Sequence, residues 1–330
     1  MSPSRRAAAI PAPPVPRSHK DFLSLLDFDP FELDQCLELA AQVKIDRVLG
    51  REAPTVDALG GRHVAMLFEK PSLRTRSTFE IAVRELGGEV IALHPESALG
   101  KREPVADVAR NLERWVDAVV IRTFSQRLLE EFAASAPRLH VINALTDEQH
   151  PCQILADCLT LRERWGVLRG RTVAFVGDGN NVAVSLVHAC ALLGVNVHVA
   201  SPDGYQLPTS AVQQATAAAR HGARLRLFSE AADAVAGADA VYTDTWTSMG
   251  QESEAQIRRR VFAPFQVNDD LMARARPGAL FMHCLPAHRG EEVTDDVIES
   301  PASVVFDQAE NRLHCQKALL LTLLTGAQRR

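Results

Sequence analysis

One run of the chain combines the residue types that bind phosphate. Ser72, Arg74 and Thr75 follow an apolar stretch over 63–68 that predicts a buried strand, and a helix is predicted from Thr75 onward. Hydroxyl groups, guanidinium forks and the free N–H groups of a helix N-terminus all favour a bound anion. The run therefore predicts a phosphate site without the glycine-rich loop of nucleotide kinases. The alternative is an N-cap serine followed by solvated arginines, Arg74 and Arg76.

Other polar side chains follow strands predicted in the same half of the chain. Arg122 comes directly after the strand 118–121, and His150 and Gln153 lie beyond the strand 140–143, at the start of a helix. In open parallel sheets, ligands bind beyond the carboxyl ends of the strands. We therefore expect these side chains beside the phosphate site. The alternatives are an edge arginine that snorkels to solvent and an ordinary hydrogen-bonded histidine.

The second half of the chain offers groups that could bind an amine. Asp244 and Cys284 each follow a short apolar strand. The carboxylate could hold a cationic amine or cap a turn, and the thiol could be a nucleophile or an inert buried group. Ser248 lies in a long polar connection, 247–265, whose length is typical of a lid with Gly250 as a hinge; the alternative is a plain surface segment.

A pair of glycines, Gly177 and Gly179, raises a rival function. The pair lies between an apolar strand and a helix, as in dinucleotide-binding folds, which favours an NAD-dependent oxidoreductase. Against that function, Val182 stands at the position of the third glycine. The neighbouring Asn180 and Asn181 could instead offer their amides to a small zwitterion.

Short apolar strands alternate with helices along the chain. This alternation predicts an α/β fold of two doubly wound parallel-sheet domains joined by interdomain helices. A last strand is predicted over 303–306, and the final helix is expected to begin at Arg312. Residues 1–18, rich in Pro, Ala and Arg, predict a disordered tail. A transit peptide is the alternative, although its prolines would interrupt an amphipathic helix.

Composition excludes several classes of partner. The net charge of -5 and the lack of a basic block argue against a nucleic-acid surface. No apolar run approaches the length of a membrane span, so no membrane partner is expected. The six cysteines show neither C-x-x-C nor zinc-ligand spacing, which predicts free thiols in a reducing cytoplasm and no bound metal.

Taken together, these motifs resemble those of the ornithine carbamoyltransferases. The matching segments run in the family's order: Phe68-Glu-Lys-Pro-Ser-Leu-Arg-Thr-Arg76, His150-Pro-Cys-Gln153, Gly177-Asp-Gly-Asn-Asn181, Asp244-x-Trp-x-Ser-Met-Gly250, His283-Cys-Leu-Pro286 and Ala309-Glu-Asn-Arg312. The resemblance implies a carbamoyl-phosphate-binding domain over 19–149 and an ornithine-binding domain over 150–309. It also implies a C-terminal helix, 310–326, that packs back on the first domain, and a homotrimer.

The resemblance further implies roles for particular residues, with no cofactor and no metal. Carbamoyl phosphate would be bound by Ser72, Leu73 (through its backbone), Arg74, Thr75, Arg122, His150, Gln153, Cys284, Leu285 and Arg312. Ornithine would be bound by Asn181, Asp244, Ser248 and Met249. The residues expected to act in catalysis are Arg122, His150, Asp244 and Cys284, with the cysteine positioning substrate or handling a proton rather than forming a covalent intermediate.

Three positions depart from the family's usual residues. Ala98 stands where a glutamine or histidine usually reaches a neighbouring subunit's phosphate, Pro104 replaces a serine, and Val184 replaces a polar residue. A carbamoyltransferase for a different amine is therefore kept as an alternative. A regulatory subunit that binds carbamoyl phosphate without turnover is a second one, but such a subunit would not need both halves of the site.

Overall fold

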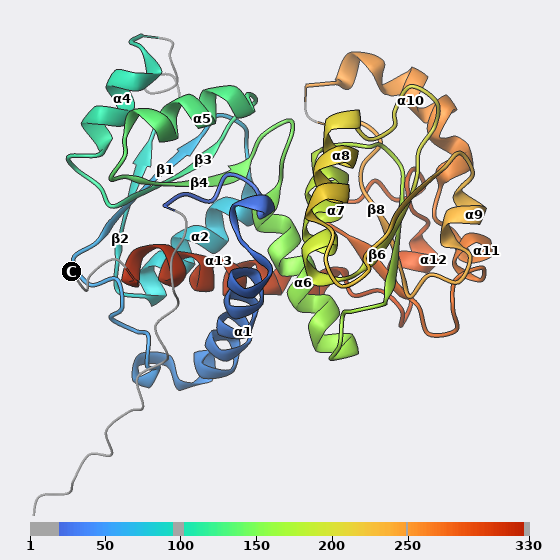
Figure 1. The fold of residues 1–330 in the computed structure, drawn as a ribbon, viewed down its shortest axis with the longest axis horizontal. Helices are drawn as coiled ribbons and strands as arrows, with labels where there is room; N and C mark the ends of the chain where they lie inside the picture. Colours follow the sequence, from blue (N-terminus) through green and yellow to red (C-terminus); the bar gives the residue numbers. More distant parts are fainter. Residues whose placement is uncertain (1–19, 95–101, 249, 327–330) are drawn as a thin grey trace, which may run out of the picture.

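The computed structural model describes residues 20–94, 102–248 and 250–326. It confirms the predicted α/β class, because two parallel sheets form the centres of two units that lie side by side (Figure 1). The predicted tail over 1–18 and the residue Ala98 lie outside the described residues.

The first sheet has the order β2-β1-β3-β4, with every neighbouring pair parallel. Its strands are β1 (His63–Phe68), β2 (Glu89–Leu93), β3 (Ala118–Arg122) and β4 (His140–Leu145). Helices α4 (Val105–Leu112) and α5 (Gln126–Ser135) pack on one face, and η1 (Leu25–Asp27), α1 (Pro30–Asp46), η2 (Arg47–Glu52) and α2 (Leu73–Glu85) belong to the other side (Figure 1). Alternate side chains of β1 enter separate cores: Ala65 and Leu67 face α4 and α5, whereas Val64 and Met66 face α2.

The second sheet has the order β7-β6-β5-β8-β9, again with parallel neighbours. Its strands are β5 (Thr172–Val176), β6 (Asn196–Ala200), β7 (Leu225–Phe228), β8 (Ala240–Thr243) and β9 (Leu280–His283). The accompanying helices are α7 (Asn181–Leu193), α8 (Thr209–Ala218), α9 (Ala231–Val235), α11 (Asp269–Met272) and α12 (Asp295–Ile298). Helix α6 (Pro151–Trp165) connects the two sheets and is buried along most of its length.

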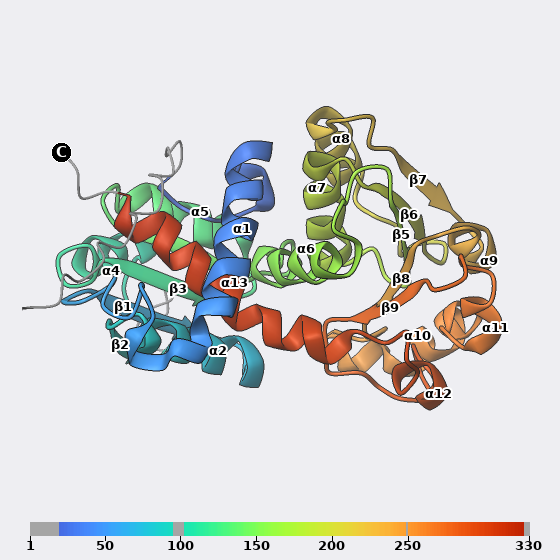
Figure 2. The same cartoon turned by 90° about the horizontal axis from the view of Figure 1, so that it is seen from below.

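The end of the chain differs from the prediction. Residues 303–306 do not form a strand, since Ser303 makes only an isolated bridge to Phe281. Helix α13 begins at Val305 rather than Arg312 and continues to Thr325. It packs against α1, α2 and α6, and runs from beneath the second sheet to the first unit (Figure 2).

The segment predicted as a long polar connection, 247–265, is also different. It contains η3 (Glu252–Glu254), α10 (Ala255–Phe262) and η4 (Ala263–Phe265). Arg258 of α10 explains this order, because its buried guanidinium donates to Asp178 and to the carbonyl of Trp246. Of the described residues in this segment, only 247, 248, 250 and 251 lie outside these helices.

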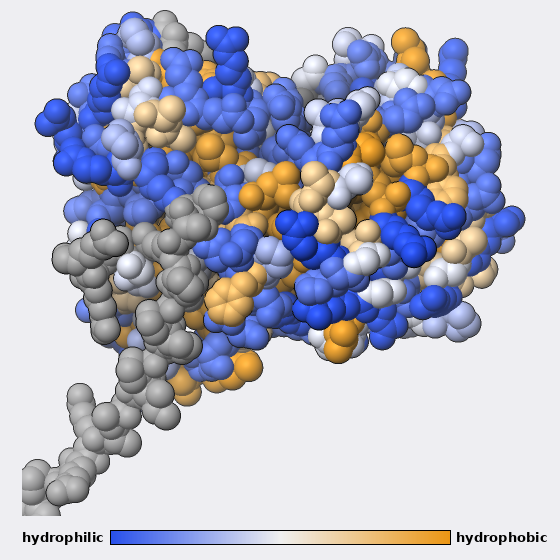
Figure 3. Space-filling view, viewed as in Figure 1, coloured by the Kyte–Doolittle hydropathy of each residue, from blue (hydrophilic) through white to orange (hydrophobic). Residues whose placement is uncertain are grey.

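Among the described residues, no helix is both long enough and apolar enough to cross a bilayer. Hydrophobic side chains are interspersed with hydrophilic ones over the face shown in Figure 3.

Candidate active site

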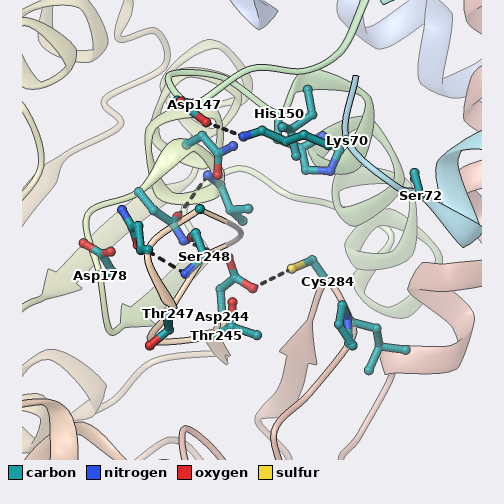
Figure 4. A pocket seen from close by; sticks show the side chains of 18 of the residues that line it. Lys70, Ser72, Asp147, His150, Asp178, Asp244, Thr245, Thr247, Ser248 and Cys284 are labelled. Carbon is teal, nitrogen blue, oxygen red and sulfur yellow. Dashed lines mark hydrogen bonds and ion pairs between the residues drawn. The ribbon is translucent and has the colours of Figure 1, made fainter. Parts of the chain in front are cut away.

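A cavity of about 710 Å³ lies where the carboxyl ends of the two sheets meet. Both units supply its walls, as the close view in Figure 4 shows for Ser72 on one side and Ser248 on the other. The predicted site residues that line it are Ser72, Leu73, Arg74, Thr75, Arg122, His150, Asn181, Asp244, Ser248, Cys284, Leu285 and Arg312. Gln153 lies behind this wall, and Met249 lies outside the described residues.

The N-terminus of α2 forms one wall of the cavity. The helix begins at Leu73, earlier than the predicted Thr75, and Ser72 is its N-cap residue. The Ser72 side chain makes no bond to its own helix, so its hydroxyl is free to meet an anion. Arg76 does not contribute to the cavity, because it is exposed and pairs with Glu80 at 3.0 Å.

Three arginines gather beside this helix end. Burial lowers the pKa of Arg74, Arg122 and Arg312, and for Arg122 the nearby charges of Arg312 and Arg74 lower the pKa further, to about 10. The Nε atoms of Arg122 and Arg312 are buried without a hydrogen-bond partner among the described residues. Mutually repelling guanidinium groups with unused donors form a strong site for a dianion.

His150 adds a neutral donor or acceptor to the same cluster. Burial, followed by the charges of Arg312 and Arg122, lowers the pKa of His150 well below its usual value, so the ring is uncharged at neutral pH. Its Nδ1 is buried without a partner within the described ranges. The backbone N–H of His150 donates to Ser185 Oγ of α7 at 2.8 Å, which fixes this loop against the second unit.

Gln153, which was predicted to contact carbamoyl phosphate, lies behind the cavity wall and against Arg312. Its Oε1 accepts a hydrogen bond from Arg312, whose other Nη donates to Thr75 Oγ1 at 2.5 Å. Gln153 therefore holds Arg312 in place from behind.

Asp244 and Cys284 lie together on the opposite wall, at the ends of β8 and β9. The Cys284 thiol donates to Asp244 Oδ1 at 2.9 Å, and Asn180 donates to Oδ2 at 2.8 Å (Figure 4). Burial and the Asp244 charge raise the pKa of the Cys284 thiol well above its usual value. The thiol is therefore protonated at neutral pH and is a poor nucleophile.

The backbone around Cys284 is held in an uncommon conformation. Leu285 has a φ of 55°, in the left-handed region that side chains other than glycine rarely adopt. Its N–H donates to His283 Nδ1 at 2.9 Å, while His283 Nε2 pairs with Glu292 at 3.1 Å. Outliers of this kind cluster at ligand sites, where the surroundings fix them.

Asp244, His283 and Cys284 could also offer ligand atoms to a metal ion, since those atoms lie within 4.8 Å of one another. Both ring nitrogens of His283 are already hydrogen-bonded, however. The ring would have to break one of these bonds to bind an ion, so this donor set fits a metal poorly.

Two further predicted residues lie at the boundary of the units. Asn181 Nδ2 donates to the carbonyl of Thr146 at 2.5 Å, across the interface. Ser248 donates its backbone N–H to Gln251 at 3.2 Å, and its side chain lines the cavity.

Several lining residues were not predicted from the sequence. Lys70 is buried, pairs with Asp147 at 2.5 Å and lies over the Phe124 ring at 4.1 Å. Asp178 and Arg258 also line the cavity and form an ion pair of 2.7 Å. Lys70 could have been found from its place in the phosphate-binding run, but the partners of Arg258 are too distant in sequence to suggest each other.

The dinucleotide alternative fails on the geometry of its glycines. A Cβ on Gly179 would lie 2.4 Å from the backbone nitrogen of Leu207, so this loop fills the space that a pyrophosphate would need. The N-terminus of α7 is also occupied, because Asn180 Oδ1 accepts from the N–H groups of Val182 and Ala183.

Comparison with known proteins decides the family. Residues 20–163 match the family model for the carbamoyl-phosphate-binding domain of aspartate/ornithine carbamoyltransferases, and residues 169–323 match that for the Asp/Orn-binding domain. The chain belongs to the aspartate/ornithine carbamoyltransferase family.

Individual relatives in this family are named ornithine carbamoyltransferases. The chain is 51% identical over 306 residues to the ornithine carbamoyltransferase of Thermosynechococcus vestitus. The aligned region covers 92% of this chain and 96% of that protein. Its structure is similar to that of the ornithine carbamoyltransferase from Pyrococcus furiosus, with a TM-score of 0.89 and 48% identity over 94% of this chain and 98% of the other. The enzyme from Thermus thermophilus gives a TM-score of 0.83 and 44% identity, covering 93% of this chain and 100% of the other.

Proposed function

We propose that this protein is an ornithine carbamoyltransferase, which transfers the carbamoyl group of carbamoyl phosphate to the δ-amine of L-ornithine and gives L-citrulline and phosphate. The observation that carries the proposal is a single cavity with buried guanidinium groups on one wall and the Asp244–Cys284 pair on the other. Relatives about half identical over nearly the whole chain bear this name, which supports the choice of ornithine.

The first wall suits carbamoyl phosphate. The N-terminus of α2, Ser72 and Arg74 bind the phosphate, and Arg122, His150 and Thr75 meet the carbonyl oxygen of the carbamoyl group. Arg312 lies between them, held by Thr75 and Gln153. Negative charge develops on that oxygen during attack and then on the departing phosphate, and these groups stabilise both.

The second wall suits a diamino acid. Asn181, Asp244, Ser248 and Met249 bind ornithine, with Asp244 facing a cationic amine. The δ-ammonium must lose a proton before its nitrogen can attack the carbamoyl carbon. Asp244 and the Cys284 thiol provide a hydrogen-bonded path for that proton, after which the C–N bond forms and the C–O bond to phosphate breaks.

Replacing Cys284 by serine tests the role of the thiol. The serine hydroxyl can also donate to Asp244, so the Cys284→Ser variant is expected to lose no more than roughly tenfold in kcat, since a weakened hydrogen bond costs about 1 kcal/mol. Mass spectrometry of the intact wild-type protein with carbamoyl phosphate is expected to show no added carbamoyl group. A stable adduct on Cys284 would instead make the thiol a nucleophile.

We also propose that the protein acts as a homotrimer, or a multiple of trimers, in the cytoplasm. All six cysteines are unpaired, which agrees with a reducing compartment. The family resemblance supports the trimer, which analytical ultracentrifugation of the full chain tests.

The deciding experiment is a carbamoyl-transfer assay with carbamoyl phosphate and separate amines, which detects the ureido product of each amine (citrulline in the case of ornithine). Turnover is expected with ornithine, and not with putrescine, acetylornithine, lysine or aspartate. If only a different amine is carbamoylated, that amine is the acceptor in place of ornithine. Pro104 and Val184 would then contribute to the changed acceptor specificity. No turnover with any amine, in a protein that still binds carbamoyl phosphate, would favour a binding subunit.

A further inference from the structure

A buried carboxylate links the two walls of the cavity without lining it. Asp157 of α6 is fully buried and accepts three hydrogen bonds. Gln153 Nε2 donates to its Oδ1 at 2.9 Å, Gln308 Nε2 donates to the same oxygen at 2.9 Å, and the Tyr242 hydroxyl donates to Oδ2 at 2.8 Å. The donors come from α6, α13 and β8, so the carboxylate lies where these elements meet.

On one side, this carboxylate fixes the amide that holds Arg312. A glutamine amide donates only from its nitrogen and accepts only at its oxygen. Because Gln153 gives its nitrogen to Asp157, its oxygen must face Arg312, which donates to it. The orientation of Gln153 thus depends on an acceptor at position 157, and Arg312 in turn reaches Thr75.

On the other side, the same carboxylate fixes a second amide near Cys284. Gln308 also gives its nitrogen to Asp157, which turns its oxygen toward the backbone N–H of His283 at 3.0 Å. His283 is the last residue of β9 and directly precedes Cys284. The strand end that carries the thiol is therefore tied to the same atom as the arginine on the opposite wall.

We propose that Asp157 is a positioning residue for the reaction proposed above, which sets both amides and thereby the places of Arg312 and of the Cys284 strand end. A carboxylate suits this task because it accepts from three donors without donating to any of them. Burial raises the pKa of Asp157 to about 6, against the opposing effect of its three hydrogen bonds, so the group is ionised at neutral pH.

The substitution Asp157→Leu tests the proposal with a side chain of similar shape that has no acceptor. Both glutamine nitrogens then lose their partner, so neither amide is held in one orientation and Arg312 and the Cys284 strand end are displaced. A displacement of that kind is expected to lower kcat/KM for carbamoyl phosphate by about 100-fold and to weaken the binding of inorganic phosphate measured by calorimetry.

Asp239→Leu is the matched control. Asp239 is also a buried aspartate, lies just before β8 at the end opposite the cavity, and accepts from Arg171, Arg276 and the N–H of Thr172. This variant is expected to lower the melting temperature without changing kcat/KM for carbamoyl phosphate or the affinity for phosphate. If a folded Asp157→Leu protein behaves in the same way, Asp157 is only a structural residue and the proposal fails.

A double-substitution cycle separates positioning from a general effect of charge. In a Gln153→Leu background the amide is absent, so Asp157→Leu is expected to weaken phosphate binding far less than in the wild type. Fully additive losses would overturn the proposal. Gln308→Leu keeps the charge and is expected to lower kcat while leaving the phosphate affinity unchanged, which tests the second link even if Asp157→Leu does not fold.

The phosphate measurements need no ornithine, so they do not depend on the acceptor. A wild-type protein that binds phosphate but makes no citrulline would contradict the proposed function. The effect of Asp157→Leu on phosphate affinity would still decide the role of Asp157.

Discussion

Replacing Arg122 by methionine is expected to lower kcat by about 10²- to 10³-fold, because a donor aimed at the developing oxyanion is removed. The same change is expected to leave the melting temperature equal or higher. Burial and the charges of Arg312 and Arg74 lower the pKa of Arg122 to about 10, so the folded protein without ligand bears an electrostatic cost for its charge. Methionine keeps most of the apolar stem and removes that cost. Steady-state kinetics and thermal unfolding of the same preparation check both expectations.

Arg76→Met is the control for this variant. Arg76 lies on the same helix end but is exposed and paired with Glu80, so its loss is expected to change neither kcat nor stability measurably. Added carbamoyl phosphate is expected to raise the melting temperature of the wild type and of Arg76→Met more than that of Arg122→Met. An Arg122→Met enzyme with wild-type kcat would remove Arg122 from the proposed machinery.

The sequence predicted the strands well where burial selects their residues. Runs such as 118–121 and 240–243 are apolar because both faces of a parallel sheet are covered, and the polar residue that follows each run marks the sheet edge. Arg122 and Asp244 were therefore placed correctly at the cavity, although neither is near the other in sequence.

An apolar run led to a wrong strand prediction near the end of the chain. Ser303-Val-Val-Phe306 has the composition of a strand, but Val305 begins α13, and Phe306 is 66% exposed while Gln308 is buried. Short apolar runs do not separate a strand from the first turn of a buried helix. The tertiary partners of α13, namely α1, α2 and α6, decide the outcome.

Side-chain pairs between distant segments could not be predicted at all. The ion pair of Asp178 with Arg258 joins residues 80 positions apart, and it orders a segment that seemed to be a loop. The place of Gln153 at the start of a helix suggested that it lies beside the phosphate site, but it does not reveal that the Gln153 amide oxygen accepts a hydrogen bond from Arg312. Spacing gives the face of a helix, and packing decides what that face meets.

Asp244→Asn is expected to abolish most of the activity, because the variant binds the substrate amine less well and helps less to remove its proton. The asparagine is nearly isosteric, but it has no charge to attract an ammonium and one fewer acceptor for Asn180 and Cys284. We expect kcat/KM for ornithine to fall by about 10²- to 10⁴-fold, the range for loss of a group that handles a proton. The affinity for inorganic phosphate is expected to stay the same, because the buried arginines lie on the other wall.

The pH dependence of this variant separates proton handling from simple attraction. If Asp244 helps to remove the proton of the amine, the defect of Asp244→Asn is expected to shrink as the pH rises toward about 10, the usual pKa of a primary alkylammonium. More of the ornithine then arrives uncharged and needs no base. If Asp244 only attracts the cation, the wild type binds ornithine better than Asp244→Asn until the pH approaches about 10, where the amine loses its charge. In that case kcat at saturating ornithine differs little between the two proteins at any pH. Equal kcat values near neutral pH would therefore limit Asp244 to binding.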